Sequence, residues 1–153
     1  MSPARKIRRA TPSKEQRPQA LSPSLRGNPN LDDWIRIDAA DTITVRTGKV
    51  ELGQGITTAV ALIAAEELDV SVARIRVETA DTARLPNEWM TVGSMSIETS
   101  GLAVRQAAAE ARHQLLARAV DHLGAARDQL EVEDGVVRAR GGAASVSYWE
   151  LMG

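Results

Sequence analysis

The sequence predicts an α+β fold, in which short β-hairpins and a small sheet pack against one buried helix and one long amphipathic helix. Three observations lead to this prediction. Several short runs alternate apolar and polar residues, as half-buried strands do. Residues 56–68 are apolar on almost every side, which is typical of a buried helix. Residues 97–123 repeat apolar residues at helical spacing, with polar residues on the other side.

Composition limits what such a fold can do. The 153 residues suffice for one domain, and 43% hydrophobic with 25% charged residues is ordinary for a soluble globular protein. The absence of cysteine excludes disulfides, zinc–thiolate sites and iron–sulfur clusters held by this chain. Two histidines are too few for a self-contained metal site. Because no apolar run approaches the roughly 20 residues of a membrane span and no secretory pattern is found, we expect no membrane partner and a cytoplasmic location.

The N-terminal segment differs in composition from the rest of the chain. It holds seven Lys or Arg, one acidic residue and four of the six prolines, which predicts a disordered basic arm over residues 1–28. Such an arm binds nucleic acid or an acidic partner, or serves only as a solubilising or docking tail. Nucleic acid is the less favoured partner, because no aromatic residue lies among the basic ones and residues 29–153 hold twelve basic against nineteen acidic residues.

The first half of residues 29–153 predicts a hairpin followed by a helix and a strand, with order beginning near Leu31. In order the elements are strands over 34–38 and 42–46, a short further strand or a continuation of the second over 49–52, a helix over 56–68 and a strand over 74–79. Strand, helix and strand in succession indicate a βαβ-like packing of the helix on the sheet.

The second half predicts a long helix, a hairpin and the start of a further helix. In order these are an irregular stretch over 81–90, a helix over 97–123 with Gly124 as its stop, a hairpin over 129–138 and a helix from residue 145 onward. The hairpin turns at Asp134-Gly135, a strong two-residue turn signal. Ser147 and Glu150 have the spacing of a capping box. Because the chain stops just after this, we expect the domain that starts at residue 29 to be partial and truncated at its C-terminus.

Two glycine-containing segments stand where long helices are predicted to begin. Gly53-Gln54-Gly55 precedes the first helix, and Gly93-Ser94-Met95-Ser96 precedes the second. A helix N-terminus offers free N–H groups and a partial positive charge, and glycine lets a ligand approach the backbone. Two such termini side by side would form a cradle for a phosphate, with further donors from nearby Ser and Thr hydroxyls. Each segment alone is more often structural, so this interpretation requires the two helix N-termini to converge in space.

The same segments resemble a known family. Thr47 to Gly55, which reads TGKVELGQG, resembles the Gly-Gln-Gly cofactor motif of the xanthine oxidase and aldehyde oxidase family of molybdenum hydroxylases. Further stretches follow in the family's order and spacing, namely residues 66–70, 74–77, 91–96 and 100–108. The likeness covers about Pro29 to the C-terminus and is greatest to large subunits of the isoquinoline 1-oxidoreductase and nicotinate dehydrogenase type.

The resemblance implies a molybdopterin cofactor, with molybdenum held through the cofactor and no iron–sulfur cluster in this chain. Bacterial members usually carry the cytosine dinucleotide form, so that form is implied here. The positions that match the family's cofactor contacts are Leu52, Gly53, Gln54, Gly55, Thr91, Gly93, Ser94, Met95 and Ser96. By resemblance, those in the first segment contact the molybdopterin and those from Thr91 onward hold its phosphate side.

Some parts of the family pattern are missing. The Phe-Gly-Gly segment near the metal and the late glutamate base are absent, and the sequence holds no Phe. The resemblance therefore implies a cofactor-binding segment of a molybdenum-dependent hydroxylase or dehydrogenase acting on N-heterocycles or aldehydes, without a catalytic residue or metal ligand of its own. Activity would require an iron–sulfur subunit, a chain that completes the molybdenum site and a small-molecule substrate. The alternative is a non-catalytic interaction protein or a remnant of that family.

Other polar and aromatic residues are interpreted as structural. Glu51 and Glu98 flank the two motifs and are expected to be capping or solvated rather than catalytic. His113 and His122 are expected on the surface of the long helix. The tryptophans are expected in the core or at interfaces, with Trp89, just before the second motif, as the exception.

Overall fold

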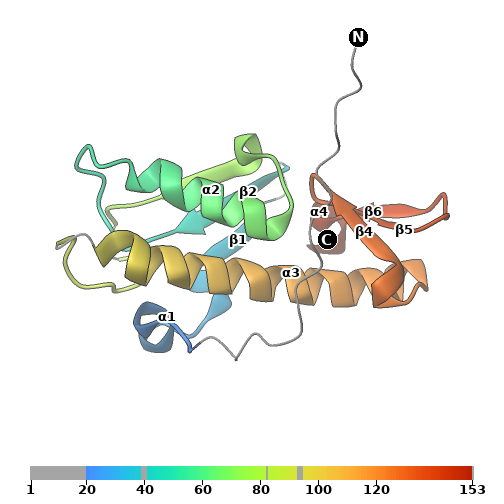
Figure 1. The fold of residues 1–153 in the computed structure, drawn as a ribbon, viewed down its shortest axis with the longest axis horizontal. Coiled ribbons are helices and arrows are strands. Elements are labelled where there is room, and N and C mark those ends of the chain that lie inside the picture. The colour runs from blue at the N-terminus through green and yellow to red at the C-terminus, as the bar shows by residue number, and fades with distance from the viewer. Residues whose placement is uncertain (1–19, 39–40, 82, 93–94, 153) are drawn as a thin grey trace, which may run out of the picture.

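The computed structural model describes residues 20–38, 41–81, 83–92 and 95–152, and shows two small sheets and one long helix that contacts both (Figure 1). The helices are α1 (Pro23–Gly27), α2 (Ile56–Leu68), α3 (Leu102–Leu123) and α4 (Tyr148–Met152), with a π-helical turn over Ser96–Gly101 before α3. The strands are β1 (Ile35–Asp38), β2 (Thr42–Arg46), β3 (Ile75–Glu78), β4 (Leu130–Glu133), β5 (Val136–Ala139) and β6 (Ser145–Ser147). Short 3-10 turns occupy Leu31–Asp33, Val72–Arg74 and Arg127–Gln129. The predicted α+β class is confirmed.

The first sheet has the order β1-β2-β3 and contains the predicted hairpin and βαβ unit. β1 and β2 pair antiparallel, with Ile35 opposite Val45. β3 pairs parallel with β2, and α2 lies in the connection between them. A parallel pair needs such a crossover, because both of its strands start at the same edge of the sheet. Residues 39–40 of the predicted hairpin turn lie outside the described residues.

α2 and α3 lie side by side and pack against this sheet (Figure 1). Their apolar faces share one core with Trp34 and Val45. α2 buries only one side, since Leu62 is 54% exposed and shares the outer side with Thr58 and Glu66. The predicted buried helix is therefore buried on the side that faces the sheet and α3, and exposed on the other, because these neighbours cover only part of its circumference.

α3 carries the apolar face predicted for it. Its members Val104, Ala108, Ala111, Leu115 and Ala119 are all buried. The helix ends at Gly124, whose φ of 61° lies in the left-handed region that glycine adopts without a Cβ clash. The predicted start at residue 97 needs correction, because Ser96–Gly101 is a π-helical turn and regular α geometry begins at Leu102. Neither α3 nor any other helix in the described ranges is both long and apolar enough to cross a membrane.

β4, β5 and β6 form the second sheet, which is antiparallel. The β4–β5 hairpin turns as predicted at Asp134-Gly135, whose φ values of 48° and 76° fit a type I′ turn. The helix predicted from residue 145 starts later, because Ser145–Ser147 pairs with β5 as a strand. Its capping box is confirmed: the Ser147 N–H donates to the Glu150 carboxylate at 2.7 Å, and the Glu150 N–H donates to the Ser147 hydroxyl at 3.2 Å.

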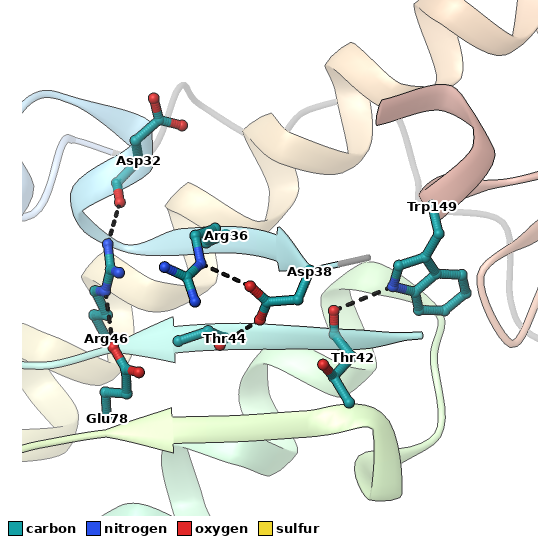
Figure 2. Close-up of polar contacts among 8 residues, drawn as sticks. All are labelled: Asp32, Arg36, Asp38, Thr42, Thr44, Arg46, Glu78 and Trp149. Carbon is teal, nitrogen blue, oxygen red and sulfur yellow. Dashed lines mark hydrogen bonds and ion pairs between the residues drawn. The ribbon is translucent and has the colours of Figure 1, made fainter. Parts of the chain in front are cut away.

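One cluster fixes the second sheet against the first. Trp149 of α4 donates its indole N–H to the Thr42 carbonyl of β2 at 3.1 Å (Figure 2). The Arg74 guanidinium lies over the same indole at 4.8 Å and donates to both oxygens of Asp134 at 3.0 Å. The Ser71 N–H also donates to Asp134, at 2.7 Å, and together with Arg74 it holds the pKa of that carboxylate below its ordinary value. This cluster therefore connects the two sheets directly, in addition to the contacts that α3 makes with both.

The predicted disordered arm extends too far along the chain. Residues 20–28 belong to the described structure, and Pro23–Gly27 is helix α1, which packs against α3. Ser22 is fully buried, its N–H donates to Gln106 Oε1 at 2.8 Å, and its hydroxyl donates to the Thr99 carbonyl at 2.9 Å. Proline and charge content favoured disorder here, but specific bonds to a distant helix override that tendency. Residues 1–19 of the arm lie outside the described residues.

Tyr148 makes the stability of the fold sensitive to alkaline pH. Its side chain is fully buried, and its hydroxyl donates to the Leu68 carbonyl at 3.0 Å. Burial raises the pKa of Tyr148 from 10.0 to about 12. The unfolded chain therefore loses this proton first, and the stabilisation that is present below pH 10 is lost as the pH rises toward 12. We expect the free energy of unfolding, measured with urea, to fall by roughly 2–3 kcal/mol across that window.

Tyr148→Phe is the control for this prediction. Removal of the hydroxyl should cost about 1–2 kcal/mol at neutral pH, because the Leu68 carbonyl loses a donor. It should also flatten the pH dependence between 10 and 12. An equally steep loss in the Phe variant would assign the alkaline sensitivity to other groups.

Candidate functional site

Gly53–Gly55 and the described part of the second glycine-containing segment, Met95-Ser96, lie at the same end of the molecule. α2 and α3 run in the same direction and begin at that end (Figure 1). Two ion pairs agree with this parallel direction. Arg105 pairs with Glu67 at 2.7 Å, and Arg112, later in α3, pairs with Asp69, which lies later in the chain than Glu67 and just after α2, at 2.7 Å. α2 and the π-helical turn that precedes α3 therefore lie together at this end. The convergence of the two glycine-containing motifs on one ligand stays a prediction.

A hydrogen bond joins the two segments in front of these helices. The Val50 N–H donates to the Thr91 hydroxyl at 2.9 Å. The loop that leads into α2 and the stretch that leads toward α3 are therefore in direct contact.

Seven of the nine predicted site residues are described. Gly93 and Ser94 lie outside the described residues, so the closeness of Ser94 to Gln54 stays a prediction. Leu52 and Met95 present exposed apolar side chains, and Leu52 is 72% exposed. This end of the molecule therefore offers apolar surface as well as polar groups to a ligand.

Residues 47–55 form a loop that is held by side-chain oxygens. The strand predicted over 49–52 is wrong, because the N–H groups of this stretch do not form a strand ladder. The Lys49 N–H donates to the Thr47 hydroxyl at 3.1 Å, and the Val50 N–H donates to Thr91. The alternation of apolar and polar residues here does not mark a half-buried strand, because the apolar side chains of Val50 and Leu52 are both exposed.

Gln54 is engaged within this loop. Its amide oxygen accepts from the Leu52 N–H, and its amide nitrogen donates to the Val50 carbonyl at 2.8 Å. Gly53 and Gly55 have φ values of 93° and 77°, and a Cβ added to either would meet no atom within 4 Å. The loop thus leaves its glycine surfaces open, while the Gln54 amide holds the loop in shape.

A carboxylate occupies the N–H groups at the start of α2. Glu51 Oε1 accepts from the Gly53 N–H at 2.8 Å and the Gly55 N–H at 2.9 Å, and Oε2 accepts from the Thr57 N–H at 3.1 Å. These donors, Thr57 foremost, hold the pKa of Glu51 below its ordinary value of 4.5. The expectation that Glu51 is a capping residue is confirmed. This helix N-terminus does bind an anion, and the anion is part of the chain itself.

Glu88 is the buried centre of the second loop. Only 7% of its surface is exposed. Its Oε2 accepts from the Ser100 hydroxyl at 2.7 Å, the Gly48 N–H at 2.8 Å and the Thr47 hydroxyl at 3.0 Å. Its Oε1 is buried and has no hydrogen-bond partner within the described part of the chain, so it can accept a further donor. A charged acceptor shared by three donors ties the end of β2 to the π-helical turn.

Lys49 completes the connection between the loops. Its side chain is buried, with 4% exposed, and its ammonium donates to the carbonyls of Glu88 at 2.9 Å and Met90 at 3.0 Å. The two carbonyl dipoles replace part of the hydration that the charge loses on burial. Sequence reasoning missed Lys49 and Glu88, because isolated polar residues in irregular segments have no periodic pattern. The one available signal was their position beside the two glycine-containing motifs.

Comparison with known proteins identifies the family to which this fold belongs. The family described as "Molybdopterin cofactor-binding domain" matches residues 5–153. The chain belongs to this family. The resemblance drawn from the sequence motifs is thereby confirmed.

The chain is similar to segments of several larger proteins that are named as dehydrogenases or oxidoreductases. A nicotinate dehydrogenase subunit of Pseudomonas putida is 37% identical over 78% of this chain and 10% of its own length. The beta subunit of isoquinoline 1-oxidoreductase from Brevundimonas diminuta is 35% identical over 82% of this chain and 17% of its own length. The structure of CO dehydrogenase from Oligotropha carboxidovorans matches with a TM-score of 0.67 and 30% identity, over 76% of this chain and 15% of that chain. The chain therefore spans less than a fifth of the length of each of these relatives.

Replacement of Glu88 tests whether its carboxylate holds the two loops together. Glu88→Ala leaves the Gly48 N–H and two buried hydroxyls without their acceptor, and we expect a loss of about 2–4 kcal/mol in the free energy of unfolding. Glu88→Gln keeps the shape and one acceptor oxygen, and should lose about 1–2 kcal/mol. The matched control is Glu131→Ala, at an exposed ion pair with Arg140, which should change stability by less than about 0.5 kcal/mol. Equal losses in the two Ala variants would refute the role given to Glu88.

The Glu51 cap makes the first loop sensitive to acid. The pKa of Glu51 is lowered, so its stabilisation of the loop is present above pH 4.5 and is lost as the pH falls through the folded-state pKa. In an NMR titration, the amide signals of Gly53, Gly55 and Thr57 should change together with the Glu51 carboxyl signal, below pH 4.5. Glu51→Gln should remove this response, whereas Glu150→Gln, at the cap of α4, should leave it intact. A Glu51 pKa of 4.5 or higher would contradict the cap.

Proposed function

We propose that this chain binds molybdopterin at the end where α2 and α3 begin, as one segment of a molybdenum-dependent hydroxylase or dehydrogenase. The observation that carries the proposal is the joining of the two loops, above all the 2.9 Å bond from the Val50 N–H to the Thr91 hydroxyl. It makes one surface of two segments that are 41 positions apart. That surface combines hydroxyls, apolar side chains and open glycine backbone, which are the groups that a pterin ring and a phosphate require.

The residues present fit the cofactor in two parts. We assign to the pterin side Leu52, Gly53, Gln54 and Gly55. We assign to the phosphate side Thr91, Gly93, Ser94, Met95 and Ser96. The family resemblance implies this assignment, and the Glu51 cap supports it, because the cap occupies the N–H groups of the first loop and leaves the glycine surfaces open to a neutral ring. When bound, the cofactor and its molybdenum supply the redox chemistry, and the residues of this chain bind and orient it.

We infer that the complete assembly acts on N-heterocycles or aldehydes, and adds oxygen from water to a carbon beside a ring nitrogen or to a carbonyl carbon. Relatives named for nicotinate and isoquinoline support this substrate class. Those relatives are named as subunits, and this chain has no cysteine, so we propose an iron–sulfur subunit and a chain that completes the molybdenum site as its partners. The cytosine dinucleotide form and the cytoplasmic location stay predictions.

Assembly with these partners tests the proposal. The purified chain alone should not turn over nicotinate, purines or aldehydes with an artificial electron acceptor, because it lacks a base and an electron relay. Co-expressed with the two partner subunits, it should enter a complex that contains molybdenum, measured by mass spectrometry, and pterin, measured by fluorescence after oxidation. Turnover by the isolated chain would contradict the need for partners. A complex that holds this chain but no pterin would identify it as a non-catalytic remnant.

The same assembly tests the loop residues. Gly53→Val fills the open surface at a φ of 93°, and should lower the pterin content severalfold. Gln54→Ala frees the loop from two hydrogen bonds, and should lower the affinity by about 2–10-fold. The matched control is Gln114→Ala on the exposed side of α3, where the amide donates to Glu110 at 3.0 Å, and this change should have no effect on pterin content.

A further inference from the structure

Trp89 differs from the other two tryptophans. It is 75% exposed, and its φ of 59° lies in the left-handed region that side chains other than glycine rarely adopt. Trp34 is fully buried, and Trp149 packs between the two sheets. A large indole that is held outward on a strained backbone has a cost in stability, and such strain is concentrated at functional sites.

The backbone on both sides of Trp89 is fixed. The Lys49 ammonium donates to the carbonyl before Trp89 and to the carbonyl after it, at 2.9 and 3.0 Å. The Trp89 N–H donates to Asn87 Oδ1 at 3.3 Å. The side chain before it, Glu88, is anchored in the interior by three donors. A buried cation and a buried anion thus hold the loop in the conformation that presents the indole to solvent.

The indole lies beside room for a ligand. Trp89 lines two surface hollows, one of about 400 Å³ together with Val50 and Leu85 and the other of about 380 Å³ together with Met90 and Met95. Both hollows adjoin the loops that we assign to the cofactor. Trp89 has no place in the buried core, so the packing of the domain does not account for it.

We propose that Trp89 stacks on a planar heteroaromatic ring bound at this end of the domain. The inference rests on the proposed function, which supplies three sources of such a ring: the pterin, the cytosine of the dinucleotide form, and an N-heteroaromatic substrate. The shared chemistry is an offset stack of a flat π system on the indole face. An exposed indole beside a hollow offers that face without any rearrangement of the core.

Fluorescence of the full chain tests the stack with pterin, cytidine 5′-monophosphate and nicotinate as separate probes. The probe whose ring stacks should quench the emission of wild-type protein, and its identity names the source of the ring. Trp149→Phe, which removes a tryptophan outside the site, should keep the quenching. Trp89→Phe should remove the quenching but keep most of the affinity, because a phenyl ring also stacks.

Trp89→Gly separates a ligand contact from a structural role. Binding of the quenching probe, measured by equilibrium dialysis, should weaken about tenfold because the stacking face is gone. The thermal midpoint should stay unchanged or rise, because glycine adopts a φ of 59° without strain. A purely structural role would instead lower the midpoint and leave the affinity of the folded fraction unchanged.

Two results would overturn the inference. Equal binding of a probe to wild type and Trp89→Gly would show that Trp89 does not contact the ligand. The pterin content of the assembled complex would then still test the proposed function separately. Failure of wild type to bind any of the three probes would also overturn it, and the pterin content of the complex would then decide the proposed function separately.

Discussion

Glu88 Oε2 accepts hydrogen bonds from the end of β2 and from the π-helical turn before α3, two parts of the chain that are far apart in sequence. A charged acceptor binds such donors more strongly than a neutral one does, and burial strengthens the interaction further. If the loops separated, the carboxylate would have to regain its hydration shell from water. The two loops therefore behave as one unit, and the Lys49 ammonium adds the second loop's carbonyls to that unit. The candidate site depends on this arrangement because each loop contributes only part of it.

The elements that the sequence predicts well are those that neighbouring residues determine. α2 over residues 56–68 follows from a continuous apolar run that begins after Gly55, and the β4–β5 turn follows from Asp134-Gly135, which favours positive φ at both positions. Strand β6 and the π-helical turn could not be predicted in this way. The first depends on pairing with β5, and the second on a buried partner for Ser100. Local sequence patterns do not indicate such contacts between distant residues.

The candidate site can likewise be predicted only where neighbouring residues determine it. Its glycine motifs are visible in the sequence, because glycine before a helix has a local conformational meaning. The sequence does not show which acceptors the backbone N–H groups of the motif use. In the structure, Glu51 caps the first helix, and the Gln54 amide bonds within its own loop. A motif therefore shows where backbone donors gather, but only the fold shows whether a ligand or the chain itself takes them. In the first loop of this domain, the chain itself takes them through Glu51.

The two bonds of Ser22 have a consequence for the timing of synthesis. Its acceptors, the Thr99 carbonyl and the Gln106 amide, lie 77 and 84 positions later in the chain. A ribosome that adds about 5–20 residues per second needs about 4–17 s to cover the longer of these intervals. During that delay the N-terminal segment has no docking surface, although the residues of α2 and the first hairpin are already synthesised. Its docking is therefore a late step in biosynthesis, and binding factors and proteases have several seconds of access to it before α3 is complete.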